Sequence, residues 1–158
     1  MADIAYMPPS RRGYRFCLVL VERLTSFISA IPLKSLTAES AANALRLFIG
    51  VIGYTMANLS TDFGAEFSTN FTRQLNALGI NHTSRIPRRS QSQGNAEIAI
   101  KILKTTLTKV CAGQLTHKDW DLCLPLAITS INQSNPRRAP LSRQKLYYSP
   151  FIFDQQPL

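Results

Sequence analysis

The chain is short of acidic residues and of cysteine. Of its 158 residues only nine are Asp or Glu, against 18 Lys and Arg, which gives a net charge of +9. Such an excess on a small protein points to a polyanionic partner, most often nucleic acid and less often an anionic membrane surface. The cysteines, Cys17, Cys111 and Cys123, are odd in number and widely spaced, which excludes a disulfide framework or a CxxC-type zinc site. We expect them to be reduced core residues.

Long hydrophobic runs are also absent. The longest uncharged apolar run, 47–54, has eight residues including two glycines, whereas a helix that spans a bilayer needs about twenty. The N-terminus has no basic region followed by a long apolar stretch, so it does not read as a secretory signal. The sequence therefore predicts no membrane partner and an intracellular protein.

The length and composition indicate one folded domain. A chain of 158 residues is the size of one ordinary domain. With 45% hydrophobic residues, a chain of this size buries roughly 70% of its unfolded surface. This excludes a disordered or fibrous chain.

Hydrophobic periodicity predicts an α/β domain. Strands are expected at 2–7, 15–21, 26–33, 56–60 and 80–86, with the second and third forming a hairpin. Helices are expected at 37–52, 71–78, 94–113 and 116–131, the last kinked or broken at Pro125. An exposed loop is expected at 87–93, and residues 135–158 are expected to wrap the core as a C-terminal extension. This order suggests a five-stranded mixed sheet flanked by helices.

Two helix ends carry recognisable signals. Gly79 stands where a left-handed residue would end the second helix. Thr116 and Asp119 have the spacing of a capping box, with Asp in place of Glu, at the start of the last helix.

Three acids, Asp3, Asp62 and Glu97, fall at the ends of predicted elements. If the first and fourth strands are neighbours, Asp3 and Asp62 lie side by side, and Glu97 in the first turn of the long helix can approach them. Clustered carboxylates repel one another unless a cation offsets their charge, and such hard oxygen ligands favour magnesium or manganese. Taken singly, each acid has a structural alternative: a turn cap for Asp62, a favourable helix-dipole contact for Glu97 and a solvated terminus for Asp3.

Two motifs lie around these acids. The first is DFGAEF at 62–67, and the second is IPRRSQSQGNAE at 86–97, so that Glu97 follows Asp62 by 35 positions. Together they resemble the catalytic core of retroviral and LTR-retrotransposon integrases, parts of a Pol polyprotein. GYRFCLVLVERLT at 13–25, SPF at 149–151 and QP at 156–157 extend the resemblance over nearly the whole chain.

The resemblance implies an RNase H-like catalytic core over residues 1–158. It implies that Asp3, Asp62 and Glu97 are the catalytic triad and bind two divalent metals, Mg²⁺ or Mn²⁺. Two metals can activate a water or a DNA 3′-hydroxyl and stabilise the leaving oxygen of an in-line displacement. The implied function is DNA integration, with 3′-end processing followed by strand transfer of element DNA into target DNA. Family members assemble as dimers or higher multimers, so a homo-oligomer acting in the nucleus is expected.

Basic residues near Glu97 suggest where DNA would lie. Lys101 and Lys104 follow Glu97 by four and seven residues, so all three share one helix face. In the family, lysines at these offsets and the glutamine that matches Gln93 contact viral DNA ends. A solvated charged face is the alternative for the lysines. The adjoining loop adds further charge suited to phosphates, from Arg85, Arg88 and Arg89.

A second basic group lies near the C-terminus and consists of Arg137, Arg138, Arg143 and Lys145. It would contact DNA or form a solvated tail.

Departures from the family pattern keep two other functions open. Phe63 stands where the family commonly has Asn, and Arg88 and Ser90 replace its usual aromatic or His and its Pro. One alternative is a catalytically degenerate or co-opted core that binds nucleic acid. The other is a related RNase H-like nuclease or transposase, which would hydrolyse DNA without joining it.

Overall fold

The computed structural model describes residues 1–52, 56–62, 64–84, 90–112, 116–136 and 139–153. Its strands are β1 (Ala2–Tyr6), β2 (Phe16–Val21), β3 (Ile28–Leu33), β4 (Asn58–Thr61) and β5 (Asn81–Ser84). Its α-helices are α1 (Ala38–Ile52), α2 (Thr69–Asn76), α3 (Ser90–Cys111), α4 (Trp120–Gln133) and α5 (Arg143–Phe153), and two short 3₁₀ helices are η1 (Ala65–Phe67) and η2 (His117–Asp119).

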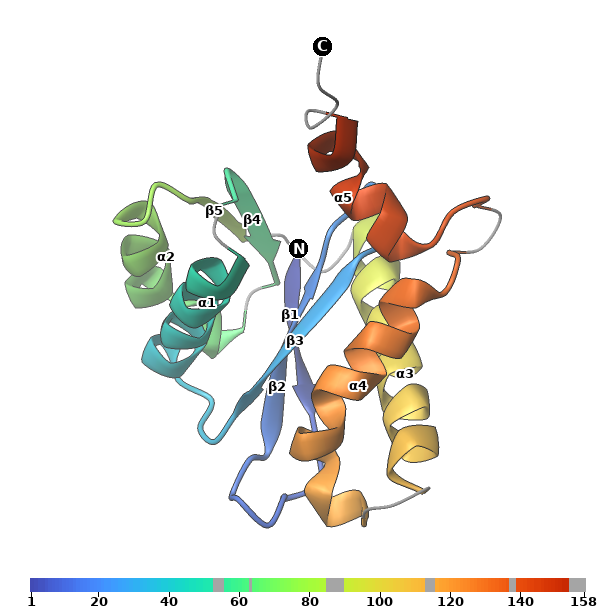
Figure 1. Cartoon of the computed structure of the whole chain (residues 1–158). Helices are drawn as coiled ribbons and strands as arrows, with labels where there is room; N and C mark the ends of the chain where they lie inside the picture. Colours follow the sequence, from blue (N-terminus) through green and yellow to red (C-terminus); the bar gives the residue numbers. More distant parts are fainter. Residues whose placement is uncertain (53–55, 63, 85–89, 113–115, 137–138, 154–158) are drawn as a thin grey trace.

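The first three strands form an antiparallel sheet in the order β1-β2-β3, and the predicted hairpin is β2–β3. The middle strand, β2, is buried on both faces from Cys17 to Val21, as expected for a continuous apolar run. Figure 1 shows α1 and α2 on one side of this sheet and α3 and α4 on the other. The sheet is therefore the middle layer of the protein.

Alternation along the strands divides the core into two clusters. Ala2, Ile4, Leu18 and Leu20 pack with α1, α2 and β4, whereas Ala5, Cys17, Val19 and Val21 pack with α3 and α4. Successive strand residues point to opposite faces, which explains this division. The three cysteines are free and buried, as predicted. Burial raises the pKa of the Cys17 thiol to about 12.

The predicted five-stranded sheet is wrong for the described strands. β4 and β5 form a separate parallel pair. Backbone bonds of Met1 and Met7 to Val21 and Arg15 place the odd-numbered residues of β1 in the ladder with β2. The N–H of Ile4 therefore points to the other edge, where it donates to the Asp3 carboxylate at 2.7 Å and not to a neighbouring strand.

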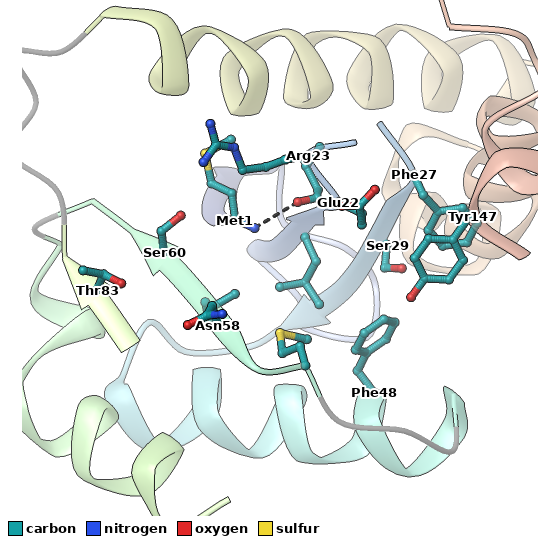
Figure 2. Close-up of a pocket in the computed structure, with 14 residues that line it drawn as sticks. Met1, Glu22, Arg23, Phe27, Ser29, Phe48, Asn58, Ser60, Thr83 and Tyr147 are labelled. Atoms are coloured by element: carbon teal, nitrogen blue, oxygen red, sulfur yellow. Dashed lines mark hydrogen bonds between the residues drawn. The ribbon is translucent and has the colours of Figure 1, made fainter. Parts of the chain in front are cut away.

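A cavity of about 590 Å³ lies between the two sheets. Its lining includes Met1 and Glu22 on one side and Asn58 and Ser60 of β4 on the other (Figure 2). The cavity lies beyond the N-terminal end of β1, whose own residues do not line it, and β1 and β4 are in contact.

The helices differ from their predicted bounds by one to four residues, and two differences change the interpretation. α3 begins at Ser90, so the expected loop at 87–93 is wrong from residue 90 onward. Gln91 and Gln93 favour a helix and Gly94 is tolerated inside one at a cost of about 1 kcal/mol. α4 runs through Pro125 without a break, although proline removes one backbone hydrogen bond.

The two end signals had different outcomes. Gly79 has a φ of 73°, which confirms the left-handed position after α2. Only half of the capping box forms. The backbone N–H of Thr116 bonds to the Asp119 carboxylate, but the Thr116 hydroxyl donates to the same carboxylate at 2.7 Å and makes no side-chain cap bond to the backbone. Asp is shorter than Glu, and here it pairs with the threonine itself.

Asn132 fastens α4 to the sheet. Its side-chain carbonyl accepts from the N–H of Ile28 at 2.9 Å, and its amide donates to the Ile28 carbonyl at 2.7 Å. Asn132 is 3% exposed and Ile28 2%. This amide therefore satisfies both backbone groups of Ile28 in a dry environment.

Arg143 is a buried cap and not part of an exposed basic group. Its Nη1 donates to the carbonyls of Ile131 and Ser134 at 3.1 and 3.2 Å, and to the Ser134 hydroxyl at 2.7 Å. A guanidinium is well placed there because the carbonyls at the end of α4 have no following turn of helix to pair with and are partly negative. Both interpretations of Arg143, a DNA contact and a solvated tail, are therefore wrong.

The C-terminal segment contains a helix that periodicity did not predict. α5 packs against α4, and Tyr147 stacks on Phe27 with ring centroids 4.2 Å apart. The wrapping of residues 135–158 as a whole stays a prediction. Within the described ranges, no helix combines the length and apolar character needed to cross a membrane.

Candidate active site

Asp3 occupies the middle of β1, on the face that α3 covers. Its carboxylate is half-buried and accepts the N–H of Ile4 at 2.7 Å. Burial raises its pKa above the ordinary value, the Ile4 hydrogen bond opposes this, and the negative charges of Asp62, Glu66 and Glu97 raise it further. A carboxyl held among like charges is unusual unless it serves a site.

Asp62 is the first residue after β4 and is exposed. The N–H of Gly64 donates to its Oδ1 at 3.3 Å, and the Thr61 hydroxyl donates to its backbone carbonyl at 2.9 Å. Contacts on both the side chain and the carbonyl therefore define its position beyond the end of the strand.

Glu97 is an exposed residue of α3. Because α3 begins at Ser90, Glu97 lies in the interior of the helix and not in its first turn as predicted. The helix packs against β1 and β2, with Ala96, Ala99 and Leu103 buried. This packing brings the charge of Glu97 close enough to act on Asp3.

The three predicted site acids thus come from β1, the end of β4 and α3, and the charges of Asp62 and Glu97 both act on Asp3. The arrangement is open: among the described residues, no three His, Cys, Asp or Glu side chains are close enough to hold one metal ion. Its donors are all carboxylate oxygens, which fit a hard divalent cation. A cation there would also offset the repulsion that raises the pKa of Asp3.

Glu66 is a fourth carboxylate near Asp3 that the sequence interpretation missed. It lies in η1, and its charge also raises the pKa of Asp3. Its side chain folds over Gly64, where an added Cβ would lie 2.5 Å from Oε1. Its position four residues after Asp62, in a segment with glycine, was the available signal, since a tight turn returns such a residue toward the strand end.

The predicted DNA-contacting residues are only partly described. Lys101 and Lys104 are exposed on α3, the helix that carries Glu97. Gln93 lies in the first turn of the same helix. Arg85, Arg88 and Arg89 lie outside the described residues.

Sequence comparison relates the chain to retroviral polyproteins. It is 30% identical over 148 residues to the Gag-Pol polyprotein of woolly monkey sarcoma virus, covering 92% of this chain and 9% of that protein. It is 32% identical over 127 residues to the Pol polyprotein of radiation murine leukemia virus, covering 80% of this chain and 22% of that protein. The chain therefore spans less than a quarter of these relatives. No protein-family model matches it.

Structural comparison relates it to integrases. The catalytic core of BIV integrase superposes with a TM-score of 0.77 at 24% identity, covering 98% of this chain and 96% of that one. A chain of the simian T-cell lymphotropic virus intasome in complex with PP2A regulatory subunit B56 gamma gives 0.78 at 27%, covering 99% and 55%. The HTLV-2 integrase core in complex with magnesium, in a trimeric form, gives 0.72 at 21%, covering 91% of each chain.

These likenesses agree with the two motifs around Asp62 and Glu97. The chain has the integrase catalytic-core fold, which is RNase H-like, and it is similar in sequence to retroviral Pol polyproteins over most of its length. In fold the chain is thus similar to retroviral integrase cores, and in sequence to a segment of retroviral Pol polyproteins.

Proposed function

We propose that the chain is a metal-dependent polynucleotidyl transferase of the retrotransposon integrase type. It would trim the ends of element DNA by hydrolysis and join the 3′-hydroxyls to target DNA. The observation that carries this proposal is the half-buried Asp3, on which the charges of Asp62 and Glu97 act from two other elements of an integrase-type fold.

Asp3, Asp62 and Glu97 would hold Mg²⁺ or Mn²⁺. When bound, two divalent ions activate the attacking water or 3′-hydroxyl and stabilise the leaving oxygen. The Ile4 N–H holds one oxygen of Asp3 in place, and the Gly64 N–H does the same for Asp62. The HTLV-2 core, which has the same fold, was solved with magnesium, and this supports the choice of metal.

DNA would approach along α3. Lys101 and Lys104 are exposed on the helix that carries Glu97, and ammonium groups beside an active site neutralise backbone phosphates. Gln93, Arg85, Arg88 and Arg89 belong to the same proposed strip. The simian virus relative was solved in an intasome, which supports a DNA-bound homo-oligomer. A nuclear site of action follows from the proposed reaction.

The test is strand transfer and 3′-end processing on short duplexes with Mg²⁺. Asp62→Asn and Glu97→Gln should each abolish both reactions, because they remove a charge needed at the metals. Glu39→Gln, at an exposed position of α1, is the matched control and should keep full activity. Activity that survives Asp62→Asn would show that the assignment is wrong, and hydrolysis without joining would identify a nuclease.

A second candidate is a degenerate core that binds nucleic acid without catalysis. It is favoured by the open arrangement of the carboxylates, since no described group of three can hold one metal. Salt-dependent DNA binding, together with no thermal stabilisation by Mg²⁺ or Mn²⁺, would support it. A rise in melting temperature with either metal that Asp62→Asn removes would exclude it.

A further inference from the structure

His82 in β5 connects three elements beside the candidate active site. Its Nδ1 lies 2.7 Å from the Thr72 hydroxyl of α2, and its Nε2 lies 2.9 Å from the Thr61 hydroxyl of β4. The ring also packs edge-on against Phe71, with centroids 5.2 Å apart. The imidazole is thus held by two hydrogen-bond partners and an aromatic face.

The protons on this chain of bonds can be assigned. The Thr61 hydroxyl donates to the Asp62 carbonyl at 2.9 Å, so its oxygen is left to accept from His82. Nε2 therefore carries the ring proton. Nδ1 accepts from the Thr72 hydroxyl, whose 2.7 Å contact with the ring is shorter than its 3.3 Å contact with the Ser68 carbonyl. This is the neutral ring, in agreement with a His82 pKa that burial lowers from its ordinary value.

The bonds end at a residue that the sheet does not hold. The β4–β5 ladder stops at the pair Thr61 and Ser84, and Asp62 is the next residue. Its carbonyl is fixed by Thr61, which is 3% exposed, and the oxygen of Thr61 is fixed in turn by His82. A rotation of the Thr61 hydroxyl would release the Asp62 carbonyl.

We propose that His82 is a positioning residue for Asp62, acting through Thr61 to orient the Asp62 carboxylate toward Asp3. This role rests on the proposed function, because it takes Asp62 to be a metal ligand. Residues that hold metal ligands in this way typically change metal affinity or activity by about 10–100-fold when they are replaced.

Two amide substitutions distinguish the bond between His82 and Thr61 from the bond between His82 and Thr72. His82→Gln places an N–H near the position of Nε2 and keeps the bond to Thr61, whereas His82→Asn reaches only toward Thr72. His82→Leu removes both bonds. We expect His82→Gln to retain the position of Asp62 and the other two variants to lose it.

The first measurement needs neither metal nor DNA. The Gly64 amide donates to the Asp62 carboxylate, so its hydrogen exchange reports where that carboxylate lies. Exchange of Gly64 should quicken in His82→Leu and His82→Asn and stay at the wild-type rate in His82→Gln. Equal rates in all four proteins would overturn the proposal, whatever the function of the chain.

The second measurement is Mn²⁺ binding, followed by the electron paramagnetic resonance of the free ion, together with strand transfer. Wild-type binding that falls about 10–100-fold in His82→Leu and in Thr61→Val, with no further loss in the double variant, is the expected result, because both changes break one link. Additive losses, or an unchanged affinity with only a lower melting temperature, would show a merely structural role. A wild-type protein that neither binds Mn²⁺ nor joins DNA would refute the proposed function and leave the exchange result to decide the positioning role.

Discussion

The two sides of the central sheet are held in different ways. The α3–α4 layer, made of helices α3 and α4, is tied to the sheet and its loops by specific polar contacts. Asn132 clasps Ile28, the indole N–H of Trp120 donates to the Pro8 carbonyl at 2.7 Å, and Arg12 pairs with Asp121 through two hydrogen bonds.

The opposite side, which we call the β4–β5 layer, comprises α1, α2, β4 and β5. It packs on the sheet through apolar side chains such as Leu59, Phe71 and Leu75, and the described strands show no ladder between β4 and β1. Asp3 and Glu97 belong to the sheet and the α3–α4 layer, whereas Asp62 belongs to the β4–β5 layer. Among the described residues the candidate site therefore spans a boundary packed mainly by apolar side chains, and its geometry depends on how the β4–β5 layer packs on the sheet.

The largest loss of stability is expected from truncating a buried side chain in the core of the β4–β5 layer. Phe71 is fully buried, and Phe71→Ala should lower the free energy of unfolding by about 3–5 kcal/mol through lost burial and a cavity. Amide hydrogen exchange should become much faster in β4 and β5 and change little in β2, because few directional bonds between described residues couple the layers. Leu103→Ala, in the α3–α4 layer, is the matched change and should quicken exchange in β2 as well. The same exchange pattern in both variants would contradict the contrast between the layers.

Breaking the clasp on Ile28 is expected to have the next largest effect. Asn132→Ala leaves a buried N–H and a buried carbonyl without their partner, at a cost of about 2–4 kcal/mol. Gln133→Ala removes an exposed amide from the next position of α4 and should change stability by less than about 0.5 kcal/mol. Urea unfolding of both variants measures the difference, and equal midpoints would show that the clasp does not hold α4.

Removing the cap on α4 tests whether the buried Arg143 and the exposed Lys101 differ in role. Arg143→Met keeps the apolar stem and removes the bonds to the last carbonyls of α4, so stability should fall by about 1.5–3 kcal/mol. The salt dependence of DNA binding should be the same in Arg143→Met as in the wild type. Lys101→Ala should instead leave stability unchanged and lower the salt slope by about 1, the value for one lost phosphate contact. A lower slope in Arg143→Met would return this residue to the DNA-binding surface.

Regular elements were predictable because their signal is local. The runs that became β2 and β3 are continuously apolar, and the spacing of Ala41, Leu45 and Phe48 defines the face that α1 buries. The spacing of the motifs around Asp62 and Glu97, with Asp3 on the predicted first strand, led to the prediction that these acids share a site, and their catalytic role stays a prediction. Their mutual influence appears in the raised pKa of Asp3.

The failures concern contacts between distant segments. Asn132 and Ile28 are separated by 104 positions, and nothing around Asn132 marks it as a clasp. Arg143 looked like part of a basic tail because its burial depends on where α4 ends. Glu66 and His82 acquire their roles only when η1 and β5 fold beside Asp62. The interrupted sheet is an exception, because the Ile4 N–H at the free edge of β1 donates to the side chain of the adjacent Asp3.

The smallest effect expected is a difference in the pH at which the two layers weaken. Burial lowers the pKa of His82 in the folded protein below its ordinary value of 6.5. As the pH falls through 6.5 the unfolded chain takes up a proton that the folded chain refuses, so the free energy of unfolding decreases until the folded pKa is reached. In urea unfolding, His82→Gln should reduce the dependence of the free energy of unfolding on pH over this range. His117→Gln, at the other, exposed histidine, is the matched control.

In the α3–α4 layer the corresponding group is Asp121. The hydrogen bond from Arg12 lowers its pKa below the ordinary 3.8. Its stabilisation is complete above 3.8 and is lost as the pH falls through the folded pKa. Hydrogen exchange at pH 5 should therefore show β5 weakened while α4 is still protected, and Asp121→Asn should alter only the lower window. Simultaneous loss of protection in β5 and α4 at pH 5 would mean that the two layers unfold as one unit. The segment that carries Asp62 would then be as stable against local unfolding as the strand that carries Asp3.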